Sequence, residues 1–134
     1  MTTCLFCRIV SGDIPSRQVY ADDHAVAFLD IAPWHRGHTL VVPRRHVSTL
    51  ADDPSVLADC QPAIEHLVGT LTSRLGADGM NVLVNVGEVA GQEVFHVHVH
   101  LVPRYGSLPG LPGLAQRDAS ADDLDEVLAQ VLAS

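Results

Sequence analysis

The stretch from Val94 to Val102 constrains the fold more than any other segment, because apolar residues and histidines alternate along it. Alternation with a period of two is typical of a β-strand, in which successive side chains point to opposite faces of the sheet. We therefore expect the apolar residues to face the core and the histidines to face the other side. The apolar residues are Phe95, Val97, Val99 and Leu101, and the histidines are His96, His98 and His100.

Three histidines on one face of a strand can form a functional site. Alternate residues of a strand lie roughly 6.6 Å apart, so the three imidazoles converge on one cleft from a rigid element. Neutral imidazole is nucleophilic near pH 7, and imidazolium is a good leaving group. The pattern therefore predicts a catalytic site, and the alternatives are a metal-binding stripe or chance clustering.

Other patterns predict the remaining elements. Short apolar runs predict strands at 19–21, 25–29, 39–43 and 80–86, the first two forming a hairpin around the polar turn 22–24. Apolar residues at helical spacing predict a helix over 54–75 that ends before Gly76 and that Pro62 should kink or split. After a loop at 103–119, a final helix is expected with Ser120 as its cap and with Asp122 and Asp123 in its first turn.

This order of elements predicts an α+β fold with an antiparallel sheet of about five strands and two helices. The 134 residues fit a single domain over 1–134, with a core over about 4–105 and a C-terminal loop and helix over 106–134. The 47% of hydrophobic residues suffices for a packed core.

Charge and composition exclude several classes of function. A formal net charge of −8 argues against binding nucleic acid or anionic membranes, which needs a broad basic field. No apolar run reaches the roughly 18 residues of a transmembrane helix, and the N-terminus lacks the pattern of a signal peptide. We therefore expect a cytoplasmic protein. In a reducing compartment the Cys4-x-x-Cys7 motif indicates metal or redox chemistry, with a free dithiol or a disulfide as the alternatives.

The segment from His96 to Val102 resembles the signature of the histidine triad (HIT) superfamily, in which three histidines alternate with hydrophobic residues and two more hydrophobic residues follow. Further segments are similar to its Hint-like branch. They are Cys4–Cys7, Gly12–Pro15, Phe28–Ile31, Gly37–Pro43 and Gly91–Gln92. The resemblance implies a HIT-like fold, a homodimer and a nucleotide hydrolase that needs no catalytic metal.

The resemblance also implies how such a hydrolase works. His98 attacks the α-phosphorus of a nucleotide, and water then hydrolyses the covalent nucleotidyl-histidine intermediate. His98 must present one nitrogen to phosphorus and keep a proton on the other, a tautomer that a backbone carbonyl commonly fixes. His100 is implied to hydrogen-bond the phosphate and to assist the leaving group.

The implied ligand is a purine nucleotide or a nucleotidyl conjugate. Asp30 is implied to accept hydrogen bonds from the ribose hydroxyls, with Phe28 and Ile31 packed near the base. Asn85 matches a residue that contacts the phosphate region. The other implied substrate-binding residues are Gln92, Glu93 and Val94.

Glu93 departs from the pattern, because the Hint-like branch often has Ser or Thr at this position. An ionised carboxylate cannot donate a hydrogen bond and repels phosphate. We expect Glu93 to point away from the phosphate, so that its backbone N–H donates instead. The alternative is a substrate that carries a cation nearby.

The resemblance further implies a structural zinc ion. Cys4 and Cys7 would bind it with His46 and His96, a Cys₂His₂ set with no open position. Cys60 is predicted to lie in the core. The other histidines are predicted to be surface or core polar residues: His24, His35, His38 and His66.

The expected substrates are nucleoside 5′-phosphoramidates, acyl-nucleotides or similar conjugates. Alternatives are a dinucleoside polyphosphate hydrolase, a nucleotidyltransferase and a nucleotide-binding regulatory protein with incidental turnover. His100 favours hydrolysis, because transferases of the galactose-phosphate type typically have Gln in its place.

Overall fold

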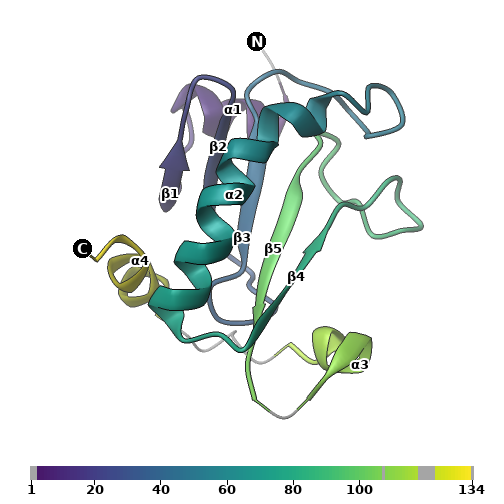
Figure 1. The fold of residues 1–134 in the computed structure, drawn as a ribbon. Coiled ribbons are helices and arrows are strands. Elements are labelled where there is room, and N and C mark those ends of the chain that lie inside the picture. The colour runs from purple at the N-terminus through teal and green to yellow at the C-terminus, as the bar shows by residue number, and fades with distance from the viewer. Residues whose placement is uncertain (1–2, 107, 118–122, 134) are drawn as a thin grey trace.

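A five-stranded antiparallel sheet in the order β1-β2-β3-β5-β4 organises the chain (Figure 1). The structure is a computed structural model that describes residues 3–106, 108–117 and 123–133. Its strands are β1 (Gln18–Ala21), β2 (Ala25–Leu29), β3 (Thr39–Pro43), β4 (Gly79–Leu83) and β5 (Val99–Arg104). The described helices are α1 (Leu5–Ser11), α2 (Val56–Leu75), α3 (Gly110–Ala115) and α4 (Leu124–Leu132). The predicted α+β class and five-stranded antiparallel sheet are confirmed.

Helix α2 covers one face of the sheet and forms the main core with it (Figure 1). Its fully buried residues recur at helical spacing, and they are Val56, Cys60, Ala63, Leu67 and Leu71. Burying a side chain such as Leu67 stabilises the fold by about 1.5–3 kcal/mol. Cys60 is a core residue, as predicted, and burial raises the pKa of its thiol to about 12.

The C-terminal end of α2 follows from its sequence, whereas the helix begins at Val56, two residues after the predicted start. Gly76 ends the helix in the left-handed conformation at φ 68°. The helix runs without interruption through Pro62, so the predicted separate first piece is wrong. None of the described helices is long and apolar enough to cross a membrane, and the cytoplasmic location stays a prediction.

Helix α1 covers part of the opposite face of the sheet. Its one buried residue, Phe6, packs there with Val26, Phe28, Leu40 and Val42 in a second core cluster. Seven residues are too few to show helical periodicity, which is why the sequence does not predict this helix. Cys4 caps it, because its sulfur accepts a hydrogen bond of 3.4 Å from the Cys7 N–H.

Several predicted boundaries need correction. Strand β5 begins at Val99 rather than Val94, because residues 94–98 bond to a loop instead of a strand, as in the 2.8 Å bond from the Val97 N–H to the Val47 carbonyl. The predicted loop at 103–119 contains α3, and β4 ends at Leu83 rather than at 86.

Helix α4 packs against α2 and β1 and contributes Val127 and Val131 to the main core. Asp123 is its cap, because its carboxylate accepts hydrogen bonds from the N–H groups of Asp125 and Glu126. The cap therefore lies three positions after the predicted cap, and Asp123 precedes the first turn instead of lying within it. Ser120 and Asp122 lie outside the described residues.

Candidate active site and metal centre

Three histidines meet on the sheet face opposite α2. His98 precedes β5 and His100 lies in it, with ring centroids 4.9 Å apart. Leu40 pairs with His100 across β3 and β5, so His38, two residues before Leu40, lies on the same face. The His38 and His100 rings are 5.2 Å apart.

His38 is therefore a site residue that the sequence analysis missed. Gly37 allows its placement: its φ is +86°, and a Cβ there would collide with Leu75. The sequence contained two indications of this role. The 37–43 segment is part of the family resemblance, and His38 lies two residues before Leu40, so both point to the same face of the sheet. Reading β3 and β5 as neighbours would have placed His38 beside His100.

His98 is held in one tautomer. Its Nδ1 lies 2.8 Å from the His96 carbonyl, which can only accept, so the proton is on Nδ1 and the lone pair is on Nε2. Phe6, another residue that the sequence analysis missed, packs edge-on against the imidazole at 5.0 Å. Burial lowers the pKa of His98, whereas the bond to His96 and the charges of Asp30 and Glu93 act in the opposite direction. The side chain is thus an uncharged imidazole with a free nitrogen.

His38 and His100 form a chain of hydrogen bonds with a fixed direction. The Trp34 backbone N–H donates to Nδ1 of His38 at 3.1 Å, so the His38 proton is on Nε2. That Nε2–H lies 2.9 Å from Nδ1 of His100 and donates to it. The His100 proton is therefore on Nε2.

This Nε2–H of His100 is buried and has no hydrogen-bond partner among the described residues. A buried donor without an acceptor costs about 1–3 kcal/mol, so the site is incomplete without a ligand acceptor. Burial lowers the pKa of both His38 and His100 to about 3, and the two rings are neutral at pH 7.

The candidate ribose and base residues differ in how accessible they are. One oxygen of Asp30 accepts from the Ala32 N–H at 2.8 Å, and the other lies 3.7 Å from Nε2 of His38. Ile31 is 82% exposed and can contact a ligand. Phe28 is 4% exposed and packs against Phe6, so it supports the site from within the core.

Gln92 organises the loop between β4 and β5. Its Oε1 accepts from the Gly87 N–H at 2.9 Å, and its Nε2 donates to the carbonyls of Ser48 and Val94 at 2.8 and 3.1 Å. The amide is therefore fully used by the backbone. Asn85 lies against Gly91 in this loop, where a Cβ on Gly91 would approach its Nδ2 to 3.2 Å.

Glu93 and Val94 lie between the triad and the cysteine motif. Glu93 is exposed and lines a cavity of about 450 Å³, together with Cys4, His46 and Phe95. Val94 is half-buried against the second core cluster.

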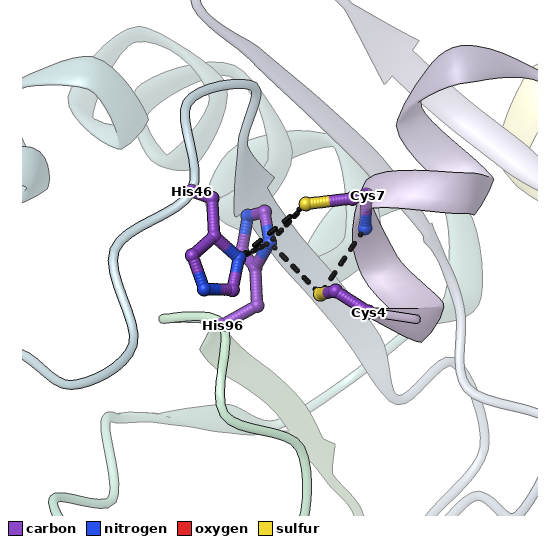
Figure 2. A group of neighbouring side chains, drawn as sticks. All are labelled: Cys4, Cys7, His46 and His96. Carbon is purple, nitrogen blue, oxygen red and sulfur yellow. Dashed lines mark hydrogen bonds between the residues drawn. The ribbon is translucent and has the colours of Figure 1, made fainter. Parts of the chain in front are cut away.

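Four predicted metal ligands converge from three segments of the chain. Figure 2 shows Cys4 and Cys7 at the start of α1, facing His46 from the loop after β3 and His96 from the segment before β5. Nδ1 of His96 lies 3.5 Å from each sulfur, and Nδ1 of His46 lies 3.4 Å from the Cys7 sulfur. The two Nδ1 atoms are 3.2 Å apart.

These separations fit a tetrahedral zinc ion. Bonds of about 2.3 Å to sulfur and 2.0–2.1 Å to nitrogen place sulfur and nitrogen about 3.5 Å apart and two nitrogens about 3.3 Å apart. Nε2 of His96 donates to the Pro43 carbonyl at 2.8 Å, and Nε2 of His46 lies 3.3 Å from the Ser48 hydroxyl. The Nδ1 lone pair of His96 therefore faces the metal position, and a cation there would bind it together with Nδ1 of His46.

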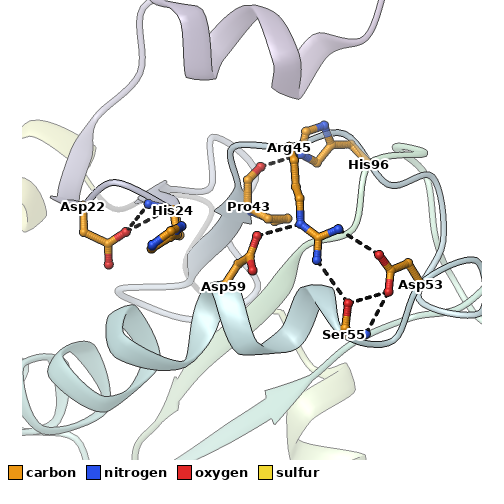
Figure 3. A network of polar contacts seen from close by, with 9 residues as sticks. Asp22, His24, Pro43, Arg45, Asp53, Ser55, Asp59 and His96 are labelled. Carbon is orange, nitrogen blue, oxygen red and sulfur yellow. Dashed lines mark hydrogen bonds and ion pairs between the residues drawn. The ribbon is translucent and has the colours of Figure 1, made fainter.

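The loop that carries His46 is anchored to the start of α2. Arg45 bonds to Asp53 and Asp59, both at 2.8 Å, and to the Ser55 hydroxyl at 3.3 Å (Figure 3). A guanidinium with two carboxylate partners fixes the backbone next to His46, so the metal ligand is held by its neighbour.

The fold and this site together define a histidine triad protein. A sequence model of the HIT domain matches residues 11–107, and the chain belongs to that family. Among its relatives, an adenylylsulfatase of Arabidopsis thaliana is 38% identical over 75% of this chain, a match that covers 52% of the relative.

Two solved structures extend the comparison. A zinc-bound histidine triad family protein of Mycobacterium smegmatis is 36% identical, with a TM-score of 0.77 over 96% of this chain and 90% of that one. A hypothetical histidine triad nucleotide-binding protein of Sulfolobus tokodaii is 27% identical, with a TM-score of 0.80 over 96% of this chain and 89% of that one. The family thus includes a zinc-bound protein, a nucleotide-binding protein and a hydrolase.

Proposed function

We propose that the protein hydrolyses nucleoside 5′-phosphoramidates or related nucleotidyl conjugates at the α-phosphate, through a covalent bond to His98. The observation that carries this proposal is a free Nε2 on neutral His98 beside the buried, unpartnered Nε2–H of His100. A nucleophile and a donor on adjacent positions of one face suit attack on a phosphate, which needs mainly positioning and charge stabilisation.

In this mechanism Nε2 of His98 forms a bond to the α-phosphorus as the bond from phosphorus to the leaving group breaks. An amine leaving group departs with a proton from solvent, and the water that later attacks phosphorus returns a proton to solvent. His98 keeps its Nδ1 proton, so the intermediate is a nucleotidyl-imidazolium, which is readily displaced. Water then attacks phosphorus and releases the nucleoside monophosphate, restoring neutral His98. Throughout, Nε2–H of His100 donates to the substrate.

The remaining residues bind the nucleotide or stabilise the site. Asp30 has acceptor capacity for the ribose hydroxyls, Ile31 is exposed for the base, and Asn85 and the Glu93 backbone N–H are proposed to meet the phosphate. Cys4, Cys7, His46 and His96 would hold zinc with every coordination position filled, so the metal supplies structural support. We propose that the reaction needs no second, catalytic metal.

The Arabidopsis relative favours a second candidate substrate. An adenylylsulfatase cleaves a mixed anhydride of an adenylyl group, so adenylyl sulfate and dinucleoside polyphosphates belong beside phosphoramidates as substrates to test. A nucleotidyltransferase or a nucleotide-binding regulatory protein with incidental turnover would share the same pocket.

A panel of substrates tests the proposed function. We expect release of AMP from adenosine 5′-phosphoramidate, adenylyl sulfate or diadenosine polyphosphate, with the best substrate identifying the leaving group. A 2′,3′-dideoxy form of that substrate should bind more weakly by about 1.5–3 kcal/mol, the range for hydrogen bonds to a charged group, here Asp30. Equal binding of both forms would contradict the role of Asp30. Tight AMP binding without turnover of any substrate would favour the regulatory protein.

We also propose a homodimer. Strand β4 lies at an edge of the sheet, and Val82 and Val86, on and just after it, are 49% and 43% exposed. Pairing two such edges would cover them and extend the sheet. Light scattering at micromolar concentration should give twice the chain mass of 14.4 kDa, and a monomer would refute the proposal.

A further inference from the structure

Trp34 contacts the His38–His100 pair through both its backbone and its side chain. Its N–H donates to His38, as described above, and its indole stacks on the His100 ring at 5.0 Å and 19°. The same indole lies 4.7 Å from the His38 ring. One half-buried residue therefore covers both imidazoles and starts their hydrogen-bond chain.

The segment after β5 holds Trp34 in place. The guanidinium carbon of Arg117 lies 4.8 Å from the centre of the indole, a cation–π geometry. Nearby, Nε2 of His35 donates to the Leu114 carbonyl at 3.2 Å, and the Tyr105 hydroxyl donates to the Arg36 carbonyl at 2.8 Å. These bonds dock α3 and its flanking residues onto the loop that carries Trp34.

We propose that Trp34, held by Arg117, is a positioning residue that shields the His38–His100 pair from water and so keeps the pair's outer proton on Nε2 of His100. Removing the indole would admit water to both rings, where it would compete for His38 Nε2–H and for Nδ1 of His100. The donor aimed at the substrate would then lose its fixed direction. The effect of Trp34 on catalysis rests on the proposed function, whereas its effect on the position of the His100 proton does not.

The charges around the pair are compatible with this role. Asp30 at the end of β2 favours protonation of His100, whereas His98 and Arg117 oppose it. His35, His98 and Arg117 likewise oppose protonation of His38. Burial is the largest influence on both rings, and the indole supplies part of that burial, so its loss should raise both pKa values.

Nitrogen NMR of ¹⁵N-histidine-labelled, zinc-loaded protein between pH 5 and 7.5 tests the proposal without any substrate. In the wild type we expect His38 and His100 to stay neutral across this range, both protonated on Nε2. In Trp34→Ala we expect the pair to become protonated within this range, because the rings lose the part of their burial that the indole supplies. Trp34→Phe, which keeps an aromatic ring, should resemble the wild type and serves as the matched control if the alanine variant unfolds.

A wild-type His100 protonated on Nδ1 would overturn the proposal. So would a folded Trp34→Ala variant in which both rings stay neutral across this range, or an unfolded Ala variant together with a Phe variant whose pair titrates in this range.

Trp34 is the one tryptophan of the chain, so its fluorescence reports directly on the contact between Arg117 and Trp34. Arg117→Ala should increase quenching of Trp34 by acrylamide, and Arg117→Lys, which keeps the charge but lacks the planar group, should fall between. Unchanged quenching in Arg117→Ala would contradict the role of Arg117 in holding Trp34.

With an active substrate, Trp34→Ala should lower kcat at pH 7 by about 10- to 100-fold, the cost of a misplaced group, with a smaller change in KM. Absence of turnover in the wild type would refute the proposed function and leave the NMR result standing.

Discussion

Replacing His98 with asparagine is expected to reduce turnover by about 10⁴-fold or more, the scale seen when an enzyme loses its nucleophile. The asparagine amide can still donate to the His96 carbonyl, so the variant should keep the hydrogen bond that His98 makes. It lacks the nitrogen that attacks phosphorus. Circular dichroism and the melting temperature would check that the loss comes from chemistry and not from unfolding.

The proposed covalent intermediate allows a second measurement of the same role of His98. Mass spectrometry after a quench in alkaline denaturant should find a nucleotidyl group on His98, because phosphorus–nitrogen bonds to imidazole survive base and hydrolyse in acid. His24→Ala is the matched control, since His24 is exposed on the β1–β2 turn and should keep full turnover. An adduct on another residue, or near-normal activity of His98→Asn, would contradict the assignment of the nucleophile.

Removing the zinc ligands is expected to have the largest effect on stability. A Cys4→Ser, Cys7→Ser variant should bind no zinc and melt about 10 °C or more below the wild type, because metal binding contributes several kcal/mol to folding. The effect should reach the proposed nucleophile, because the His96 side chain would bind the metal while its carbonyl accepts the His98 Nδ1–H. Activity should therefore fall although zinc does not touch the substrate.

Elemental analysis of protein purified without chelator should find one zinc per chain in the wild type and in a Cys60→Ser control, whose cysteine lies in the core. Less than about 0.2 zinc per wild-type chain, with Cys4 and Cys7 freely alkylated, would contradict the metal centre. Full stability and activity of the double serine variant would show that the metal is dispensable.

The sequence predicts best what depends on long, regular patterns. The apolar stripe of α2 and the β-branched run of β3 gave correct elements, because many buried positions repeat the same signal. The short helices were not predicted: α1 and α3 have 7 and 6 residues and are stabilised by tertiary contacts, such as Phe6 in the second core. The start of β5 was also missed, since alternation shows an extended chain and not its pairing partner.

The residues of the candidate site likewise include some that the sequence could identify and some that it could not. Motif residues near one another in sequence, such as His98 and His100, could be identified from the strand pattern and the family resemblance. Trp34 and Arg117 could not, because 83 positions separate them along the chain and their contact depends on how α3 docks. Gln92 was expected at the substrate, but its amide bonds to three backbone groups, which no sequence pattern encodes.

The sheet order has a consequence for how the protein loses function on heating. Strands β3 and β5 are interior strands, each hydrogen-bonded on both sides, and they carry or adjoin His38, His98 and His100. Amide groups in such strands exchange with deuterium only when the whole domain opens, whereas loops and edge strands exchange through local fluctuations. We therefore expect His100 to belong to a slowly exchanging part of the sheet, and His38 and His98 each lie one residue from it. Thermal inactivation should therefore coincide with global unfolding instead of preceding it.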